Sequence, residues 1–165
     1  MRQGRTKSLF ESQQPVAYVF DTSAWVNVKS HSKTDDLWVT IIDLIGHRRL
    51  FTCSQVMTEL KPDPIYQKVK RYERALLAHN GKLSDPEFRA AVGRITHDYP
   101  GMCKARGERT PADPYVIALA QLEDYVVVAD EGTVKRQTRK IPGACRNLGI
   151  CCKTLDEFFS AEMRS

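Results

Sequence analysis

The amino-acid sequence predicts an α/β fold with a central, mostly parallel sheet. Short apolar runs, typical of buried strands, alternate along the chain with segments whose apolar residues recur every three or four positions, as in amphipathic helices. Turn-forming or charged residues end each of these runs. This alternation of strand and helix favours a parallel sheet with helices packed against it.

The folded part of the chain is predicted to begin near Pro15. Residues 1–14 are mostly polar and lack periodicity, so they are interpreted as a flexible tail before a single domain over residues 15–165. Residues 16–20 are an apolar run that ends abruptly at Asp21. The run predicts a buried first strand, followed by a turn and the start of a helix.

Helices dominate the segment after the first strand. Ser54 is predicted to cap one of them, and the prolines at positions 62 and 64 are predicted to stop it. Asn80 and Gly81 are predicted to separate two further helices. The elements expected here are a helix over residues 34–45, a strand over 50–53, a helix over 54–60, and helices over 65–79 and 85–99.

The last third of the chain contains the clearest strand, an unbroken β-branched run over residues 125–129. Asp113 and Pro114 together form a strong helix start, with Asp at the cap and Pro at the first helical position. Gly149 is predicted to end a short helix, and Thr154 to cap the final one. The other elements expected here are a basic loop over 100–111, a basic stretch over 135–140, a strand over 150–152 and a helix over 155–163.

Composition narrows the class of protein. The 165 residues carry a net charge of +5, which favours a polyanionic partner, with nucleic acid as the first candidate. No stretch approaches the roughly 18 apolar residues of a membrane helix, so no membrane partner and a cytoplasmic location are expected. The five Cys are an odd number without zinc-ligand spacing, which favours reduced thiols over disulfides or a structural metal.

Acidic residues are predicted to meet at one edge of the sheet. Asp21 follows the first strand, Glu59 lies on the helix after the second, and Asp130 and Glu131 follow the 125–129 strand. Loops that leave the carboxyl ends of parallel strands share one edge, which is where ligands bind in such folds. Asp113 opens the helix that precedes the 125–129 strand, so it is expected at the same edge.

Several carboxylates in one small volume repel one another, and a divalent cation removes that conflict. Hard oxygen ligands suit Mg²⁺ or Mn²⁺, which also bind phosphate oxygens. Such a site can support hydrolysis of a phosphodiester. An acidic site on a basic protein therefore suggests a metal-dependent nuclease.

Four short motifs resemble, in order and spacing, those of the PIN-domain nucleases. The first is Val-Phe-Asp-Thr-Ser and the second is Val-x-x-Glu-Leu; the third begins Ala-Asp-Pro and the fourth is Val-Val-Ala-Asp-Glu. They span residues 19–23, 56–60, 112–120 and 127–131. A closing segment over residues 141–150 resembles the C-terminal signature of a bacterial, VapC-like PIN subgroup that carries the Asp-Pro helix start. Each motif is short, but together they cover residues 18–159.

The resemblance implies a three-layer α/β/α fold and an Mg²⁺- or Mn²⁺-dependent endoribonuclease. Because small bacterial PIN proteins are often the toxins of toxin–antitoxin pairs, it also implies RNA as substrate, a cognate antitoxin that inserts a segment into the acidic site, and a possible homodimer.

The resemblance also implies particular site residues. Its three main acidic positions fall on Asp21, Glu59 and Asp113. The fourth is predicted to be Glu131, with Asp130 as the alternative, because Ala129 replaces the Thr that family members usually carry there. Ser23 occupies a position that is Asn or Ser in the first motif, where its hydroxyl could fix Asp21 or contact a metal-bound water.

Other interpretations of the same residues remain open. Asp21 and Asp113 could simply cap helices, and Glu59 could be an exposed helix residue. A catalytically inactive nucleic-acid-binding or assembly module of the same fold is the main alternative function. An aspartyl-phosphate hydrolase is disfavoured, because no second Asp stands two residues after Asp21.

Two groups of basic residues are candidates for phosphate contacts, because they adjoin the acidic motifs in sequence. A third group recurs at helical spacing and is interpreted as a solvated helix face. The two candidate groups are Lys104, Arg106 and Arg109, and Lys135, Arg136, Arg139 and Lys140; the helical group is Lys68, Lys70, Arg71 and Arg74.

Overall fold

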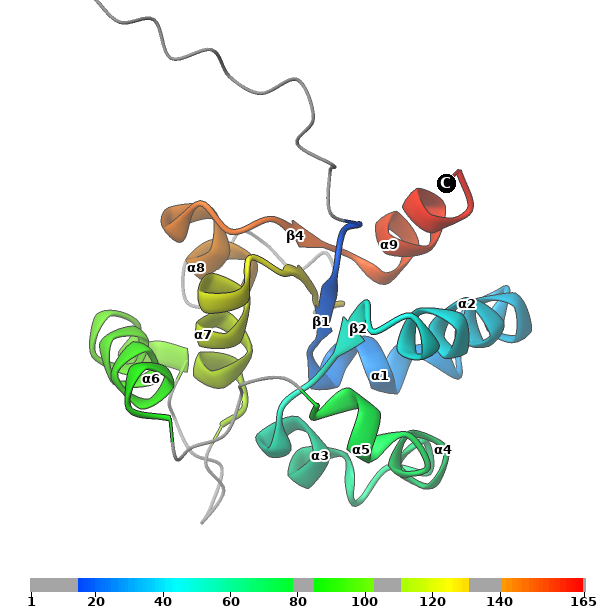
Figure 1. Cartoon of the computed structure of the whole chain (residues 1–165), viewed down its shortest axis with the longest axis horizontal. Helices are drawn as coiled ribbons and strands as arrows, with labels where there is room; N and C mark the ends of the chain where they lie inside the picture. The colour runs from blue at the N-terminus through cyan, green and yellow to red at the C-terminus, as the bar shows by residue number, and fades with distance from the viewer. Residues whose placement is uncertain (1–14, 79–84, 103–110, 131–140, 165) are drawn as a thin grey trace, which may run out of the picture.

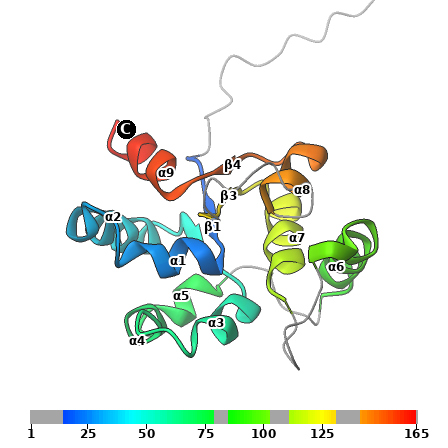
Figure 2. The ribbon, with the colours of Figure 1, turned by 180° about the vertical axis from the view of Figure 1, so that it is seen from behind.

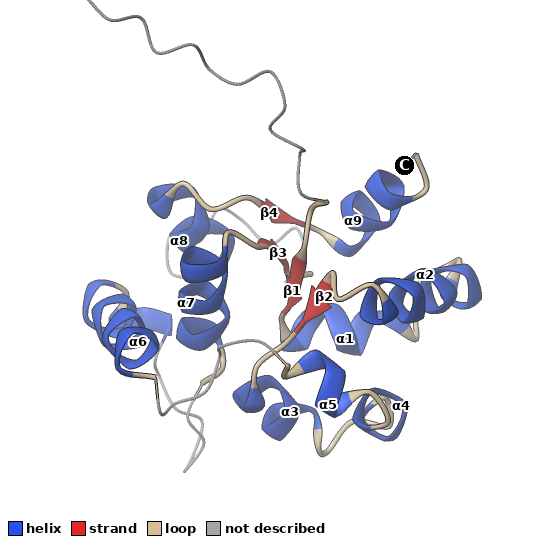
Figure 3. Ribbon diagram, viewed as in Figure 1, coloured by secondary structure: helices blue, strands red, loops and turns tan. Residues whose placement is uncertain are grey.

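The computed structural model describes residues 15–78, 85–102, 111–130 and 141–164. Within them, a four-stranded parallel sheet lies between two layers of helices (Figure 3). The predicted α/β class and its three-layer arrangement are therefore confirmed. The tail predicted over residues 1–14 lies outside the described residues.

The strands of the sheet are short; the first two are fully buried, and the fourth, at the edge, is half-buried. They are β1 (Tyr18–Phe20), β2 (Leu50–Phe51), β3 (Val126–Val128) and β4 (Cys152–Lys153), in the spatial order β2-β1-β3-β4. Val19, at the middle of β1, stands opposite Phe51 on one side and Val127 on the other. Each strand is shorter than the apolar run that predicts it, and the fourth begins two residues later than expected.

The helices form one layer on each face of the sheet (Figures 1 and 2). One face carries α1 (Thr22–Val28), α2 (Thr34–Gly46) and α9 (Leu155–Glu162). The other carries α6 (Pro86–Asp98), α7 (Asp113–Glu123) and α8 (Ile141–Leu148). The chain after β2 forms α3 (Ser54–Leu60), α4 (Tyr66–Lys70) and α5 (Glu73–Leu76), and a 3₁₀ turn, η1 (Pro100–Met102), follows α6. No helix among the described residues combines the length and apolar character needed to cross a membrane.

Aromatic side chains join the sheet to the layer of α1 and α9. Phe20 on β1 lies 4.9 Å from the ring of Trp25 and 4.9 Å from that of Phe158, measured between centroids. Phe158 also meets Tyr18 edge to face at 4.8 Å. Such edge-to-face arrangements are preferred by aromatic rings and add to the gain from burial. These contacts fix α9 against the central strand.

The helix ends show why most of the local predictions are correct. The Asp85 carboxylate accepts the backbone N–H of Glu87 at 2.9 Å, and Pro86 takes the first helical position of α6. At α9, Thr154 and Glu157 form a reciprocal capping box. Both arrangements satisfy backbone N–H groups that a helix leaves without partners at its start.

Gly149 ends α8 in a left-handed conformation, with φ of 69°. The N–H of Ile150 donates to the Cys145 carbonyl and that of Gly149 to the Arg146 carbonyl, at 2.9 and 3.3 Å. This is the Schellman pattern, in which glycine is strongly favoured because a Cβ strains the left-handed backbone.

Gly149→Ala is therefore expected to lower the free energy of unfolding by about 1 kcal/mol. The space around an added Cβ is open, so backbone strain is the whole cost. Gly93→Ala is the matched control: its Cβ also meets nothing within 4 Å, but it lies inside α6, where Ala is favoured over Gly by roughly 1 kcal/mol. Urea denaturation should move the two midpoints in opposite directions, and a shift in the same direction would contradict the assignment.

Three local predictions are wrong. The helix expected over residues 65–79 is two short helices, α4 and α5, and the Leu76 carbonyl at the end of α5 accepts the N–H of Thr52 at 3.1 Å. This bond to the chain after β2 places α5 independently of α4. The caps of α3 and α7 lie one residue earlier than expected, at Cys53 and Ala112. Neither has a side-chain capping bond, and Ser54 and Asp113 are the first helical residues instead.

Candidate active site

Asp21 lies at the carboxyl end of β1, where the chain turns into α1. Its side chain caps the helix and accepts hydrogen bonds from the backbone N–H and the hydroxyl of Ser23, at 3.2 and 2.8 Å. The backbone N–H of Asp21 donates to the carbonyl of Val128 on β3 at 3.0 Å. The residue is 3% exposed, and its other carboxylate oxygen, Oδ1, is buried without a hydrogen-bond partner among the described residues. A buried unpaired acceptor of this kind is costly and uncommon.

Glu59 approaches Asp21 from α3 and joins the first turns of two other helices. One carboxylate oxygen accepts the hydroxyl hydrogen of Thr22, the first residue of α1. The other accepts the backbone N–H of Ala112, directly before α7, at 2.9 Å. A carboxylate is favoured at helix N-termini, where it satisfies free N–H groups and meets the positive end of the helix dipole. We refer to Asp21 and Glu59 as the acid pair.

A negative charge on Asp21 is unfavourable beside the charge of Glu59. Burial raises the pKa of the Asp21 carboxyl, and the charge of Glu59 raises it further, while the hydrogen bonds from Ser23 act in the opposite direction. Burial also raises the pKa of the neighbouring Cys53 thiol to about 12, and the charges of Asp21 and Glu59 add to that effect. Cys53 therefore stays protonated at neutral pH.

Ser23 connects Asp21 to the loop after β3. Its hydroxyl accepts the N–H of Asp130 at 2.9 Å while it donates to Asp21. The Asn27 side chain on α1 in turn donates to the Asp130 carboxylate at 2.9 Å and to the Asp130 carbonyl at 3.1 Å. Sequence reasoning predicted that Ser23 could fix Asp21. It missed Asn27, because an Asn on a helix surface carries no signal of a partner 103 residues away.

The other predicted acids are placed differently. Asp113 is the first residue of α7, next to Ala112, which Glu59 contacts. The Asp130 carboxylate is held by Asn27, and Glu131 lies outside the described residues. Among residues 15–78, 85–102, 111–130 and 141–164, no three His, Cys, Asp or Glu side chains form a group that could hold a metal ion. The structure thus brings together Asp21 and Glu59, and it forms no larger group of predicted ligands within the described part of the chain.

The acid pair nevertheless has the donor chemistry that a divalent cation needs. Carboxylate oxygens are the ligands preferred by Mg²⁺ and Mn²⁺. The Oδ1 atom of Asp21 is buried without a hydrogen-bond partner in the described part of the chain. Burial raises the pKa of the Asp21 carboxyl, and the charge of Glu59 raises it further. Two carboxylates fit a Mg²⁺ site, because this ion commonly keeps several waters and takes few protein ligands.

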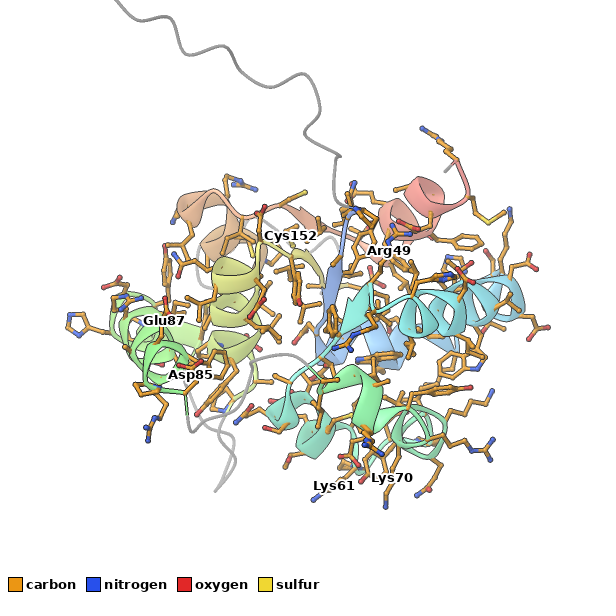
Figure 4. All side chains as sticks on the ribbon, viewed as in Figure 1. Arg49, Lys61, Lys70, Asp85, Glu87 and Cys152 are labelled. Atoms are coloured by element: carbon orange, nitrogen blue, oxygen red, sulfur yellow. The ribbon has the colours of Figure 1, made fainter. Side chains whose placement is uncertain are left out.

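Basic side chains gather on the helices that follow Glu59. Lys68 lies over the ring of Trp38 at 5.7 Å and Lys70 over that of Tyr66 at 5.6 Å. Figure 4 shows Lys61 and Lys70 pointing away from the body of the protein. Lys68, Lys70, Arg71 and Arg74 are all exposed, as the prediction of a solvated helix face requires. The two candidate phosphate-contact groups, over residues 104–109 and 135–140, lie outside the described residues.

A polar cavity of about 370 Å³ opens beside Asp130. Asn27 lines it together with His31, whose Nε2 lies 2.7 Å from a carboxylate oxygen of Asp156 on α9. The His31 Nδ1 accepts the N–H of Lys33 at 3.1 Å, which leaves Nε2 as the donor to Asp156. The polar residues that line this cavity therefore lie near the hydrogen bond between Ser23 and Asp130.

Comparisons with known proteins place the chain in a family and support its fold. A family model described as a domain of unknown function, DUF4411, matches residues 18–164. The crystal structure of PAE2754 from Pyrobaculum aerophilum is similar, with a TM-score of 0.51 and 16% sequence identity over 91% of this chain and 98% of that one. At this identity the likeness supports the fold alone. No curated protein matches the sequence.

Proposed function

The chain belongs to the DUF4411 family, and we propose that it is a metal-dependent endoribonuclease that uses Mg²⁺ or Mn²⁺ to hydrolyse RNA phosphodiester bonds. The observation that carries the proposal is the acid pair at the carboxyl end of β1. There a fully buried Asp21 leaves Oδ1 unpartnered and lies close enough to Glu59 for the charge of Glu59 to raise its pKa. Stability alone disfavours such an arrangement, and functional sites are where it is usually retained.

Asp21 and Glu59 are the proposed metal ligands within the described residues. Ser23 orients Asp21 through the 2.8 Å bond from its hydroxyl, and Thr22 orients Glu59 in the same way. Asp113, which directly follows Ala112, is the proposed third ligand on the sequence pattern alone, because among the described residues it forms no three-ligand group with the acid pair. Glu131 is the proposed fourth ligand on the sequence pattern, with Asp130 as the alternative.

A divalent cation bound there would supply positive charge for the phosphate oxygens and promote ionisation of the attacking water. The protein residues would keep the site rigid, because both oxygens of Glu59 and one of Asp21 are fixed by hydrogen bonds from α1 and the start of α7. Pre-organised ligands of this kind need little rearrangement as the reaction proceeds. The net charge of +5 supports a polyanionic substrate.

The biological role that we propose is that of the toxin in a type II toxin–antitoxin pair. Its support is the resemblance of the 112–120 and 141–150 segments to those of small bacterial PIN proteins. A cognate antitoxin that inserts a basic segment at the acid pair, and a homodimer, belong to the same proposal. Function on a given fold depends on the site, so this role needs its own test: co-expression with a neighbouring small reading frame should suppress growth arrest.

Glu59→Gln is expected to lower RNA cleavage roughly 100-fold, because it removes one charge of the acid pair while an amide oxygen can still accept one of the two hydrogen bonds. Purified full-length protein is incubated with labelled structured and unstructured RNA, with Mg²⁺, with Mn²⁺, or with EDTA. Glu87→Gln, on the exposed surface of α6, is the matched control and should cleave like the wild type. Cleavage that persists in EDTA or in Glu59→Gln would contradict the metal mechanism.

A catalytically inactive nucleic-acid-binding module is the second candidate. Two observations favour it: no group of three potential ligands forms among the described residues, and Ala129 stands where PIN proteins usually carry Thr. RNA binding by the wild type, without cleavage under any metal condition, would support this candidate and exclude the first.

A further inference from the structure

A second cavity, of about 380 Å³, opens along β4 at the edge of the sheet. Figures 1 and 2 show β4 lying between α8 and α9, and Figure 4 labels Cys152 at this position. The volume is in the lower part of the roughly 300–1,000 Å³ range of small-molecule sites. The lining residues that matter here are Ala129, Pro142, Arg146, Ile150, Lys153 and Glu157.

Two cationic side chains face this cavity from different elements. Arg146 comes from the last turn of α8 and Lys153 from β4. Neither takes part in any of the salt bridges between described residues. Glu157 contributes a negative charge to the wall, but one of its oxygens accepts the N–H of Thr154 at 2.9 Å in the capping box. Within the described part of the chain, the cavity therefore offers two cations without an ion-pair partner against one partly engaged carboxylate.

Much of the remaining wall is apolar. Ala129, Pro142 and Ile150 contribute aliphatic surface, and Cys152 and Thr154 complete the lining. A cavity lined by both cations and apolar surface suits a ligand that has an anionic end and a flat, weakly polar body. A nucleotide has this combination, because its phosphate can contact Arg or Lys while its base packs on apolar side chains.

The residues at the end of β3 link this cavity to the acid pair. Ala129 lines the cavity, and the next residue, Asp130, donates its N–H to Ser23, which holds Asp21. We propose that this cavity binds one nucleotide of the substrate, with its phosphate on Arg146 and Lys153 and its base or sugar against Pro142 and Ile150. The identity of that substrate as RNA rests on the proposed function, whereas binding of a free nucleotide does not.

The test measures binding without catalysis. Adenosine 5′-monophosphate is titrated into the full-length protein in EDTA, to about 10 mM, and followed by NMR shifts of backbone amides. Inorganic phosphate and adenosine are titrated separately. We expect the monophosphate to bind at least several-fold more tightly than either part, with shifts at residues that line the cavity.

Charge-removing variants identify the site. Arg146→Gln and Lys153→Gln should each raise the Kd of the monophosphate about tenfold, which is the usual effect of losing one charge-assisted contact. Arg94→Gln, which removes an exposed charge from α6, should leave it unchanged, and Arg146→Lys should restore part of the affinity. In an RNA cleavage assay, the first two variants should raise KM with little change in kcat.

The outcomes separate this inference from the proposed function. If the monophosphate causes no shift at the cavity, or if inorganic phosphate binds equally well, the nucleotide assignment is overturned. Monophosphate binding by a protein that cleaves no RNA would support the cavity and overturn the nuclease proposal. Cleavage of RNA without monophosphate binding would overturn the cavity and leave the acid pair standing.

Discussion

Asp21→Asn is expected to lower RNA cleavage about 1,000-fold or more while raising the stability of the metal-free protein. The loss of activity follows because a neutral amide replaces the buried carboxylate of the acid pair, and metal ions supply several kcal/mol of charge stabilisation in such reactions. The gain in stability follows because the variant no longer buries a charge beside Glu59. We expect an increase of about 1–2 kcal/mol in the free energy of unfolding at neutral pH.

The stability difference should depend on pH in a defined direction. Because burial raises the pKa of Asp21 in the folded state, the folded protein binds this proton more tightly than the unfolded chain does. The stabilising contribution of protonated Asp21 is present below the unfolded pKa of about 3.9 and is lost as the pH rises through the higher folded value. The advantage of Asp21→Asn should therefore be small near pH 4, grow as the pH rises, and then level off.

Urea denaturation in EDTA at several pH values measures this effect, with Asp98→Asn on the exposed end of α6 as the control. Added Mg²⁺ should raise the unfolding midpoint of the wild type and leave that of Asp21→Asn unchanged, because a ligand stabilises only the protein that binds it. An Asp21→Asn protein that is less stable than the wild type at neutral pH would show that Asp21 serves mainly as a helix cap. Undiminished cleavage by this variant would contradict its proposed catalytic role.

Phe158→Ala is expected to produce the largest loss of stability, about 3–5 kcal/mol. Phe158 is fully buried and packs edge to face on Tyr18 and Phe20, so truncation leaves a cavity between α9 and β1. At the end of α9, Glu162 also accepts hydrogen bonds from the Tyr18 hydroxyl and from Arg49, at 2.5 and 2.9 Å. These polar contacts cannot replace the lost ring.

Thermal denaturation should show a fall in Tm of about 10 °C for Phe158→Ala. Met163→Ala, at the exposed end of α9, should change the free energy of unfolding by less than about 0.5 kcal/mol. If Phe158→Ala lost no more stability than Met163→Ala, α9 would not be anchored to the sheet as the structure indicates.

The parts of the fold that the sequence predicts correctly are those specified by local chemistry. Asp85 with Pro86, Thr154 with Glu157, and Gly149 each satisfy or end a helix through residues within a few positions. The parallel sheet follows from the alternation of strands and helices. Such signals need no knowledge of distant contacts.

The elements that the sequence predicts wrongly depend on distant partners. The break between α4 and α5 accompanies a bond from Thr52 to the carbonyl of Leu76. The α7 start differs from its prediction because Glu59, not a local side chain, accepts the N–H of Ala112. Neither contact can be predicted from the residues close in sequence to the helix that it affects.

In the candidate site, too, some features could be predicted from the sequence, while others depend on partners distant in the sequence. The rule that parallel strands end at one edge predicts that Asp21 and Glu59 approach each other, and the structure places them so. The rule gives no side-chain direction, so it could not predict that Asn27 would hold the Asp130 carboxylate. The choice between Asp130 and Glu131 stays a prediction, because Glu131 lies outside the described residues.

The hydrogen bond between Glu59 and Ala112 also has a consequence for synthesis on the ribosome. Its two partners are 53 residues apart, so Glu59 is not held in place until the start of α7 has left the exit tunnel. The backbone N–H of Asp21 in turn donates to the carbonyl of Val128, a residue that is translated later still. A nascent chain therefore exposes its acidic residues long before they are fixed in position, and a nuclease built in this way would be inactive until most of it had been translated.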